Sequence, residues 1–273
     1  VQRKPKYGKV TPMIFGTSEE SYSCDVDQVI VGLDQISTLD YQRANTPGIS
    51  DPRRAKVRMA TEQLKLHADR VFADGFFKSG VWTNEYTGVT TTPSGRQFYQ
   101  FDDANFDAVH FFGGLRTEMM RNGRRKPNVL ALGVEAYEGL KRNPEILERV
   151  KYSGSTANPA TINANVLAQL LEIDRVVVLN STYNAGGYGK EDMKFICDSK
   201  GALLAYAAPS PAIDEASAGY TLAWDMLGNG QYIAFDQWEG EDGTHTEFIE
   251  GLMSSTPKKV CDELGYFMTS CVK

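Results

Sequence analysis

The feature that most constrains this chain is one long amphipathic helix, which the residue spacing predicts over residues 51–74. Asp51 suits the N-cap position and Pro52 suits the first helical position. Apolar residues then recur three and four apart, as on one helical face: Val57, Ala60, Leu64, Ala68 and Val71. About 23 residues at ~1.5 Å each form a rod of roughly 35 Å, which is long for a helix of a globular protein.

The first two turns of this helix are basic, and the segment before it is acidic. Positive charge at a helix start opposes the helix dipole, so a compensating partner is expected for Arg53, Arg54, Lys56 and Arg58. Residues 21–50 contain no Lys and carry acids at Asp25, Asp27, Asp34 and Asp40. The apolar residues of 21–50 follow neither a clean helical nor a clean strand period. This predicts a long excursion with some strand character and too few apolar residues to fold alone. The two charged segments are complementary, or both face water.

The rest of the chain predicts a mixture of strands and helices without an internal repeat. The helices are expected at 104–121, 134–142, 144–151 and 161–171. The strands are expected at 11–15, 129–133, 175–179, 201–207, 220–224, 232–238 and 266–272. Residues 78–101 are Thr- and Gly-rich with several aromatics, which predicts a β-hairpin with its loop near 92–95.

Composition excludes several classes of protein. Of 273 residues, 41% are hydrophobic and 23% are charged, which argues against disorder and against fibres. No apolar run reaches the roughly 18 residues of a membrane span, so no membrane partner is expected. The net charge of −6 argues against a basic nucleic-acid-reading domain. The four cysteines, at positions 24, 197, 261 and 271, lack zinc-knuckle or redox spacing and are predicted to be free thiols.

The N-terminal residues 1–20 are predicted to form an extended arm. The only charged residues within 1–17 are Arg3, Lys4, Lys6 and Lys9. Such a segment binds nucleic-acid phosphates by counterion release without reading bases, or it is a solvated tail. Composition alone leaves these two interpretations open.

The residues that could bind a ligand or a metal form no recognisable site. The Gly-rich loop 184–190 follows a predicted strand and has the composition of a phosphate cradle. It lacks the Walker spacing, however, because Asn184 and Glu191 stand where that motif needs Gly and Ser or Thr. A surface loop is the favoured interpretation. His245 lies in the stretch 235–250, which is acidic and free of Lys and Arg, and a solvated face is favoured there over a weak cation site. No catalytic, cofactor-binding or metal-binding residue is predicted.

The order of motifs along the chain is nevertheless distinctive. The excursion ends in Asp40-Tyr41-Gln42-Arg43-Ala44-Asn45, and Gly80-Val81-Trp82-Thr83 follows the long helix. The most specific part is 124–224, which runs from Arg124-Arg125-Lys126-Pro127 through Tyr183-Asn184-Ala185 to Ser217-Ala218-Gly219-Tyr220. In this order the chain resembles the major capsid proteins of tailed bacteriophages, which have the Hong Kong 97-type fold.

The resemblance implies an α+β fold in five segments. Residues 1–20 would be the N-terminal arm and 21–50 an extended loop that laps over a neighbouring subunit. Residues 51–127 would form the first part of a peripheral domain, with the long helix as its spine. Residues 128–226 would form an axial domain, and 227–273 would return to the peripheral domain.

The resemblance also implies a function without catalysis. The chain would assemble as pentamers and hexamers into the icosahedral head shell of a tailed phage, in the host cytoplasm. It would be located in the virion and would enclose double-stranded DNA, with Arg3, Lys4, Lys6 and Lys9 facing that DNA. Scaffolding, portal and decoration proteins would be further partners.

Contacts between subunits are expected where the charged segments meet. The acids Asp25, Asp27, Asp34 and Asp40 would face Arg53, Arg54 and Arg58 of a neighbour. Some members of the fold join the extended loop to another subunit by a Lys–Asn bond. Since 21–50 has no Lys, no such bond is expected from this loop, and Asn45 could at most supply the other partner.

Two other readings remain open from the sequence. The first is an α/β enzyme that binds a phosphorylated ligand at 184–190. Its weakness is the missing Walker geometry, and it leaves the arm and the excursion unexplained. The second is the shell protein of a cellular nanocompartment, which shares the fold and encloses proteins. The basic arm favours a virus over this alternative.

Overall fold

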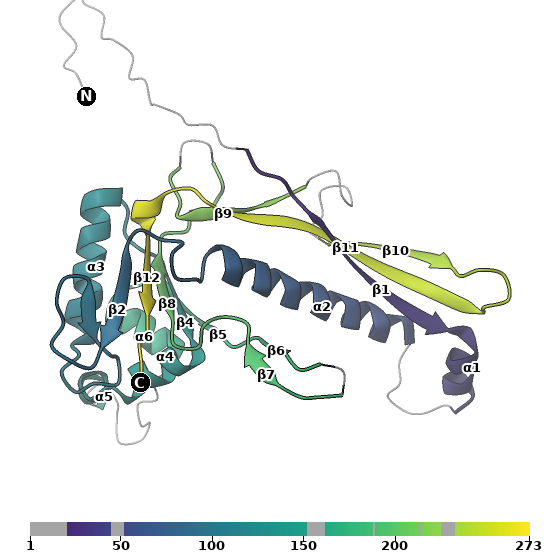
Figure 1. The fold of residues 1–273 in the computed structure, drawn as a ribbon, viewed down its shortest axis with the longest axis horizontal. Helices are drawn as coiled ribbons and strands as arrows, with labels where there is room; N and C mark the ends of the chain where they lie inside the picture. The colour runs from purple at the N-terminus through teal and green to yellow at the C-terminus, as the bar shows by residue number, and fades with distance from the viewer. Residues whose placement is uncertain (1–20, 45–51, 152–161, 188, 213–214, 225–232) are drawn as a thin grey trace, which may run out of the picture.

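The computed structural model describes residues 21–44, 52–151, 162–187, 189–212, 215–224 and 233–273. The arm 1–20, the strand expected at 11–15 and Asn45 lie outside these residues. The molecule is elongated, with a compact body at one end of its long axis and a long projection at the other (Figure 1). We call these two parts the body and the projection.

The body is built on a mixed six-stranded sheet. In spatial order its strands are β3 (Gln97–Tyr99), β2 (Glu85–Val89), β12 (Gly265–Thr269), β8 (Ala202–Ala205), β4 (Val129–Gly133) and β5 (Arg175–Leu179). The pairs β2–β3, β12–β2 and β4–β5 are parallel, whereas β8 runs antiparallel to β12 and β4. The helices of the body are α3 (Ala108–Gly123), α4 (Val134–Arg142), α5 (Pro144–Lys151) and α6 (Ala164–Leu171).

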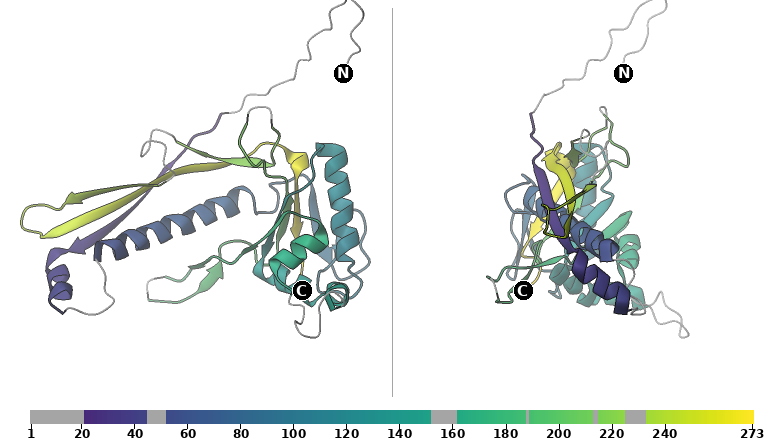
Figure 2. Two further views of the ribbon diagram at one scale, coloured as in Figure 1. Left: turned by 180° about the vertical axis from the view of Figure 1, so that it is seen from behind. Right: turned by 90° about the vertical axis from the view of Figure 1, so that its right-hand side faces the viewer.

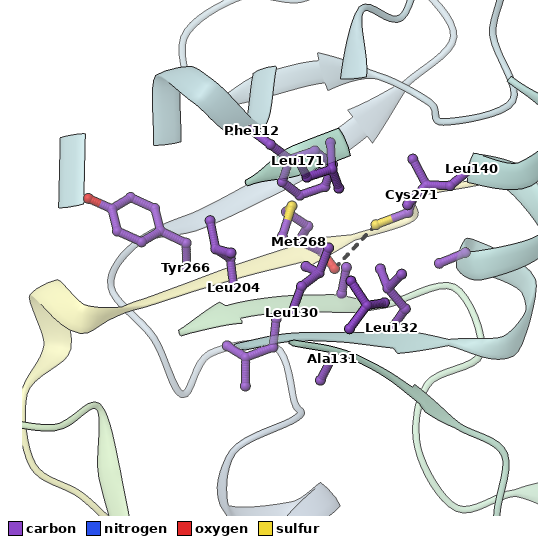
Figure 3. Close-up of a cluster of buried hydrophobic side chains, with 14 of the residues drawn as sticks. Phe112, Leu130, Ala131, Leu132, Leu140, Leu171, Leu204, Tyr266, Met268 and Cys271 are labelled. Carbon is purple, nitrogen blue, oxygen red and sulfur yellow. Dashed lines mark hydrogen bonds between the residues drawn. The ribbon is translucent and has the colours of Figure 1, made fainter. Parts of the chain in front are cut away.

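The apolar core lies between this sheet and its helices. β4 is buried along nearly its whole length because it pairs on both sides, which suits its uninterrupted apolar sequence. Its Leu130 and Leu132 are fully buried, as are Leu204 of β8 and Met268 of β12. Figure 3 shows these side chains in one cluster with Phe112 of α3. Burying this apolar area is the main source of the body's stability.

The projection consists of three antiparallel strands, β1 (Val26–Asp34), β11 (Thr246–Lys259) and β10 (Ile233–Glu239), with β11 in the middle. The long helix α2 (Pro52–Gly75) packs along this sheet, and α1 (Gln35–Ala44) follows β1 at the far end (Figures 1 and 2). The 14-residue β11 runs back toward the body, where it pairs with β9 (Gly219–Ala223).

Packing between α2 and the sheet explains why this helix is so long. Ala60 and Leu64 of α2 are fully buried, and Ile249 and Met253 of β11, the strand against which α2 packs, are buried as well. Gly251 of β11 allows the helix to approach the strand closely, because a Cβ at this position would be only 2.9 Å from Leu64 Cδ1. The helix therefore supports the projection from the body outward.

The structure confirms most of the predicted elements and corrects one. The long helix is present, and α3 begins at Ala108, after its N-cap Asp107. The β-hairpin over 78–101 is wrong, because β2 and β3 pair in parallel. Turn-forming residues predict that the chain bends between two strands, but the direction of pairing depends on β12, which lies on the other side of β2. The helix α1 and the strands β6 (Thr182–Asn184), β7 (Met193–Phe195) and β11 were not predicted.

Candidate subunit interface

The sheet of the projection has one covered and one open face. Residues directly opposite each other in an antiparallel pair lie on the same face of the sheet, so the strand register determines the face on which each side chain lies. The inner face, which packs on α2, includes Leu33, Ile249 and Met253. We call the opposite face the outer face; it consists of Val26, Gln28, Ile30, Ala234, Asp236, Trp238, Phe248, Glu250 and Leu252.

The outer face exposes more apolar surface than a monomer needs. Val26 is 47% exposed and Ile30 is 49% exposed, although both lie in a regular strand. Trp238 is 39% exposed and stacks on Phe248 with ring centroids 5.8 Å apart. In α1, which directly follows β1, Ile36 and Leu39 are also exposed. Contiguous exposed apolar surface of this kind marks an association surface.

The basic start of α2 has its compensating charge within the chain. Arg53 Nη2 lies 2.7 Å from Glu247 Oε2 of β11, and the Glu247 side chain is only 8% exposed. A buried carboxylate needs such a partner, because an unpaired charge is costly to remove from water. Within the described residues, Arg53 therefore pairs with a residue of the unpredicted strand.

The acids of the excursion have different surroundings. Asp27 Oδ2 of β1 lies 3.0 Å from His67 Nε2 of α2, which ties the edge strand to the helix. Asp34 accepts the Ile36 backbone N–H at 3.1 Å and so caps the start of α1. Asp25 and Asp40 are exposed, and no ion pair involves them within the part of the chain that the structure describes.

Two arginines near the start of α2 remain open to a neighbour. Arg54 and Arg58 are exposed and have no ion-pair partner among the described residues. Of the expected contact residues, Asp27, Asp34 and Arg53 are thus engaged within the chain, and Asp25, Asp40, Arg54 and Arg58 are exposed. The arm residues Arg3, Lys4, Lys6 and Lys9 lie outside the described residues.

The loop 184–190 does not have the geometry of a phosphate cradle. It joins the antiparallel strands β6 and β7, whereas a dinucleotide-binding loop opens a helix. The Asn184 side chain accepts the backbone N–H groups of Gly186 and Asp192, each at 2.9 Å. A phosphate would need donors of this kind, and here they are already occupied.

Two of the four cysteines, Cys197 and Cys271, are buried in the core. Burial raises the pKa of the Cys197 thiol to about 11, with Asp69 and Asp198 adding to the effect, so this thiol is protonated at neutral pH. Across the described ranges, no three His, Cys, Asp or Glu side chains gather closely enough to hold a metal ion. Within the same ranges, no helix combines the length and apolar character that crossing a membrane requires.

Sequence comparison finds one similarity to a curated protein. No protein-family model matches the chain. Over 189 residues the chain is 24% identical to the major capsid protein of Burkholderia phage BcepMu. The match covers 66% of this chain and 58% of that protein, so the chain spans less than two thirds of this relative's length.

Structural comparison identifies the fold. A phage-related protein from Bordetella bronchiseptica RB50 matches 92% of this chain and covers 77% of its own, with a TM-score of 0.71 and 18% identity. The putative capsid protein of a prophage of E. coli CFT073 matches 90% of this chain and 77% of its own, with a TM-score of 0.51 and 12% identity. The chain therefore has the α+β Hong Kong 97-type capsid fold. The resemblance to tailed-phage major capsid proteins is confirmed at the level of fold and sequence similarity.

Proposed function

We propose that the chain is the major capsid protein of a tailed phage and that it assembles as hexamers and pentamers into an icosahedral head shell around double-stranded DNA. The observation that carries this proposal is the outer face of the projection. A chain with a capsid fold exposes Val26, Ile30 and Trp238 together on one sheet, and a second copy of the chain would cover them. Repeated contacts of this heterologous kind close into rings and shells.

The five segments expected from the sequence take their places in this proposal. Residues 21–50 would be the extended loop, and their strand β1 is held by β11 of the same chain while its other face stays open. Residues 51–127 and 227–273 would be peripheral, and 128–226 axial. All three of these segments contribute strands to the six-stranded sheet. The terms peripheral and axial would therefore describe where a segment lies in a capsomer, and the segments would not fold as separate units.

The partners follow from the charges. Asp25 and Asp40 would meet Arg54 and Arg58 of a neighbour, and each such surface pair contributes only about 0–1 kcal/mol, so assembly would rest on many weak contacts. The basic arm with Arg3, Lys4, Lys6 and Lys9 would lie against packaged DNA. Scaffolding, portal and decoration proteins would complete a virion assembled in the host cytoplasm.

The test is to express the chain alone and examine it by size exclusion and negative-stain electron microscopy. Closed shells, or rings of five and six subunits, are the expected result. A chain that remains monomeric both alone and when it is produced with the other head proteins of its phage would contradict the proposal. A monomer that binds a nucleotide would support the enzyme alternative instead.

A further inference from the structure

The exposed side of α3 carries glycines that its own chain does not require. Gly113 and Gly114 lie in the middle of this helix, where Gly is less favourable than Ala. A Cβ added at either position would meet no other atom within 4 Å, so nothing in the body demands the missing side chain. We call the surface made of Gly113, Gly114, Thr117, Met120, Arg121 and Arg124 the α3 face.

The C-terminal end of the α3 face is apolar and basic. Met120 is 42% exposed although its neighbour Met119 is fully buried. Arg121 and Arg124 are exposed and form no ion pair with any described residue, whereas the adjacent Arg125 lies 4.0 Å from Glu215. Cations here suit the helix dipole, but Arg124 adopts the left-handed conformation (φ 55°), which favours glycine. The fold alone would therefore favour Gly at position 124.

The outer face of the projection has the complementary character. Its apolar residues Val26, Ile30 and Trp238 are accompanied by the acids Asp236 and Glu250. These two acids stand directly opposite each other on β10 and β11, an arrangement of like charges that is unfavourable without a cation nearby. The turn between the two strands adds further acids, and residues 235–250 contain no Lys or Arg.

The two surfaces lie at opposite ends of the molecule. α3 forms one end of the body, and the turn between β10 and β11 forms the tip of the projection, as both broad views show (Figures 1 and 2). One chain therefore cannot bring its own two surfaces together, so only a second copy can pair them. The contact would be head-to-tail, and repeated head-to-tail contacts form a ring where the rotation closes and an open filament where it does not.

From this complementarity we propose that the outer face of the projection docks onto the α3 face of a second copy of this chain, an inference that rests on the proposed function. The glycines let the sheet approach the helix closely, and Met120 packs among Val26, Ile30 and Trp238. Arg121 and Arg124 are placed to relieve the repulsion between Asp236 and Glu250. Packaged DNA is the less favoured occupant of the basic end, because phosphates explain neither the glycines nor the exposed Met120.

Two variants should separate docking from folding. Gly114→Gln fills the close approach with a good helix former, and Arg124→Gly removes a cation from a position that favours glycine. Each should raise the melting temperature of the isolated chain and still reduce assembly at least tenfold, measured by sedimentation velocity. A variant that stabilises the fold and blocks association acts at the contact surface and not through misfolding.

A charge exchange tests which surfaces meet. Arg121→Glu and Asp236→Lys should each reduce assembly. The two together in one chain should restore it, because the altered outer face of one copy then meets the altered α3 face of the next and opposite charges face each other again. Arg142→Glu at the end of α4 and Glu191→Lys in the β6–β7 turn are matched controls, because both residues are exposed and lack ion pairs among the described residues. Neither control should change assembly.

The outcomes distinguish this inference from the proposed function. If the wild-type chain forms shells and all four variants of the two surfaces do so equally well, the docking contact is wrong and the capsid function stands. Charge-dependent open chains that never close would support the docking and contradict the capsid function. If the Arg121→Glu variant forms normal shells that contain less nucleic acid than wild-type shells, the basic end of the α3 face contacts DNA and the docking proposal is wrong. A wild-type chain without any self-association contradicts both.

Discussion

At the residue scale, the pairing of Arg53 with Glu247 has consequences for any test of the interface. Arg53 stands at the start of α2, and its partner lies 194 residues away on β11. The Arg53 side chain is 56% exposed, whereas the carboxylate is nearly buried. Removing the cation therefore leaves a poorly solvated charge on the inner face of the sheet.

Arg53→Ala should lower the free energy of unfolding by about 1–3 kcal/mol, because Glu247 loses its charged hydrogen-bond partner. Arg54→Ala should change it by less than about 0.5 kcal/mol, because Arg54 is exposed and unpaired among the described residues. Urea denaturation of the two variants measures the difference. Equal losses would mean that the pair seen here does not stabilise the fold. Of the three arginines at the start of α2, Arg54 and Arg58 are therefore the suitable ones for testing contacts between subunits by charge reversal.

A second prediction at this scale concerns pH. The pKa of the Asp107 carboxyl is lower than its ordinary value of 3.8, chiefly because it accepts the His110 backbone N–H as the N-cap of α3. A depressed pKa adds stability above the unfolded pKa, and this contribution is lost as pH falls through the folded pKa.

Asp107→Asn keeps a side-chain acceptor for the cap but carries no titrating charge. The wild-type chain should therefore melt at a higher temperature than this variant at pH 7, and the gap should close as pH falls below 3.8. Melting curves followed by circular dichroism at several pH values measure it. A gap that stays constant with pH would show that the charge of Asp107 does not stabilise α3.

At the element scale, α2 and β11 stabilise each other and hold the projection straight. Leu64 is fully buried between them, close to Gly251. The helix carries only three buried residues along its length, Ala60, Leu64 and Ala73, so each apolar contact accounts for a large share of the packing. The projection is therefore expected to be less stable than the body, whose sheet is covered by helices.

Leu64→Ala should cost roughly 2–5 kcal/mol locally, from lost burial and the cavity left behind. Amide hydrogen exchange should increase in β1, β10 and β11, while β4 and β12 of the body keep their protection. Met59→Ala is the control, because Met59 is exposed and its loss creates no cavity. Equal acceleration in the body and the projection would mean that the two parts unfold as one unit.

At the scale of the whole molecule, the free chain keeps an association surface open. Val26 and Ile30 on the outer face are 47% and 49% exposed, so replacing them with polar residues should spare the fold. They are expected to be covered only in the assembled state.

Val26→Thr combined with Ile30→Thr should keep the melting temperature of the isolated chain, since Thr suits a strand and both positions are open. It should lower the binding of an apolar fluorescent dye and slow assembly severalfold. Dye fluorescence and light scattering measure the two effects. Ile249→Thr is the contrasting variant on the inner face, where Ile249 is buried, and it should unfold the projection. If the double variant binds as much dye as the wild-type chain, the apolar surface that binds the dye is not the one formed by Val26 and Ile30.

Much of the architecture could be read from the sequence because it is local. The spacing of Val57, Ala60 and Leu64 determined the long helix, and the apolar run 129–133 determined a buried strand, since periodicity and propensity act over a few residues. The order of motifs along the chain implied the fold. The strand β11 escaped prediction because its acid Glu247 faces inward, where the alternation calls for an apolar residue.

Only the tertiary structure decided how these elements meet. The parallel pairing of β2 with β3 depends on β12, which lies more than 160 residues further along the chain. Arg53 finds Glu247, and the outer face gathers Val26, Ile30 and Trp238, only when strands from both ends of the chain form one sheet. Local preferences determine which segments become helices or strands. The packing of the whole chain selects partners that are distant in sequence. A long-range strand pairing is stable only when many elements together bury its apolar surface.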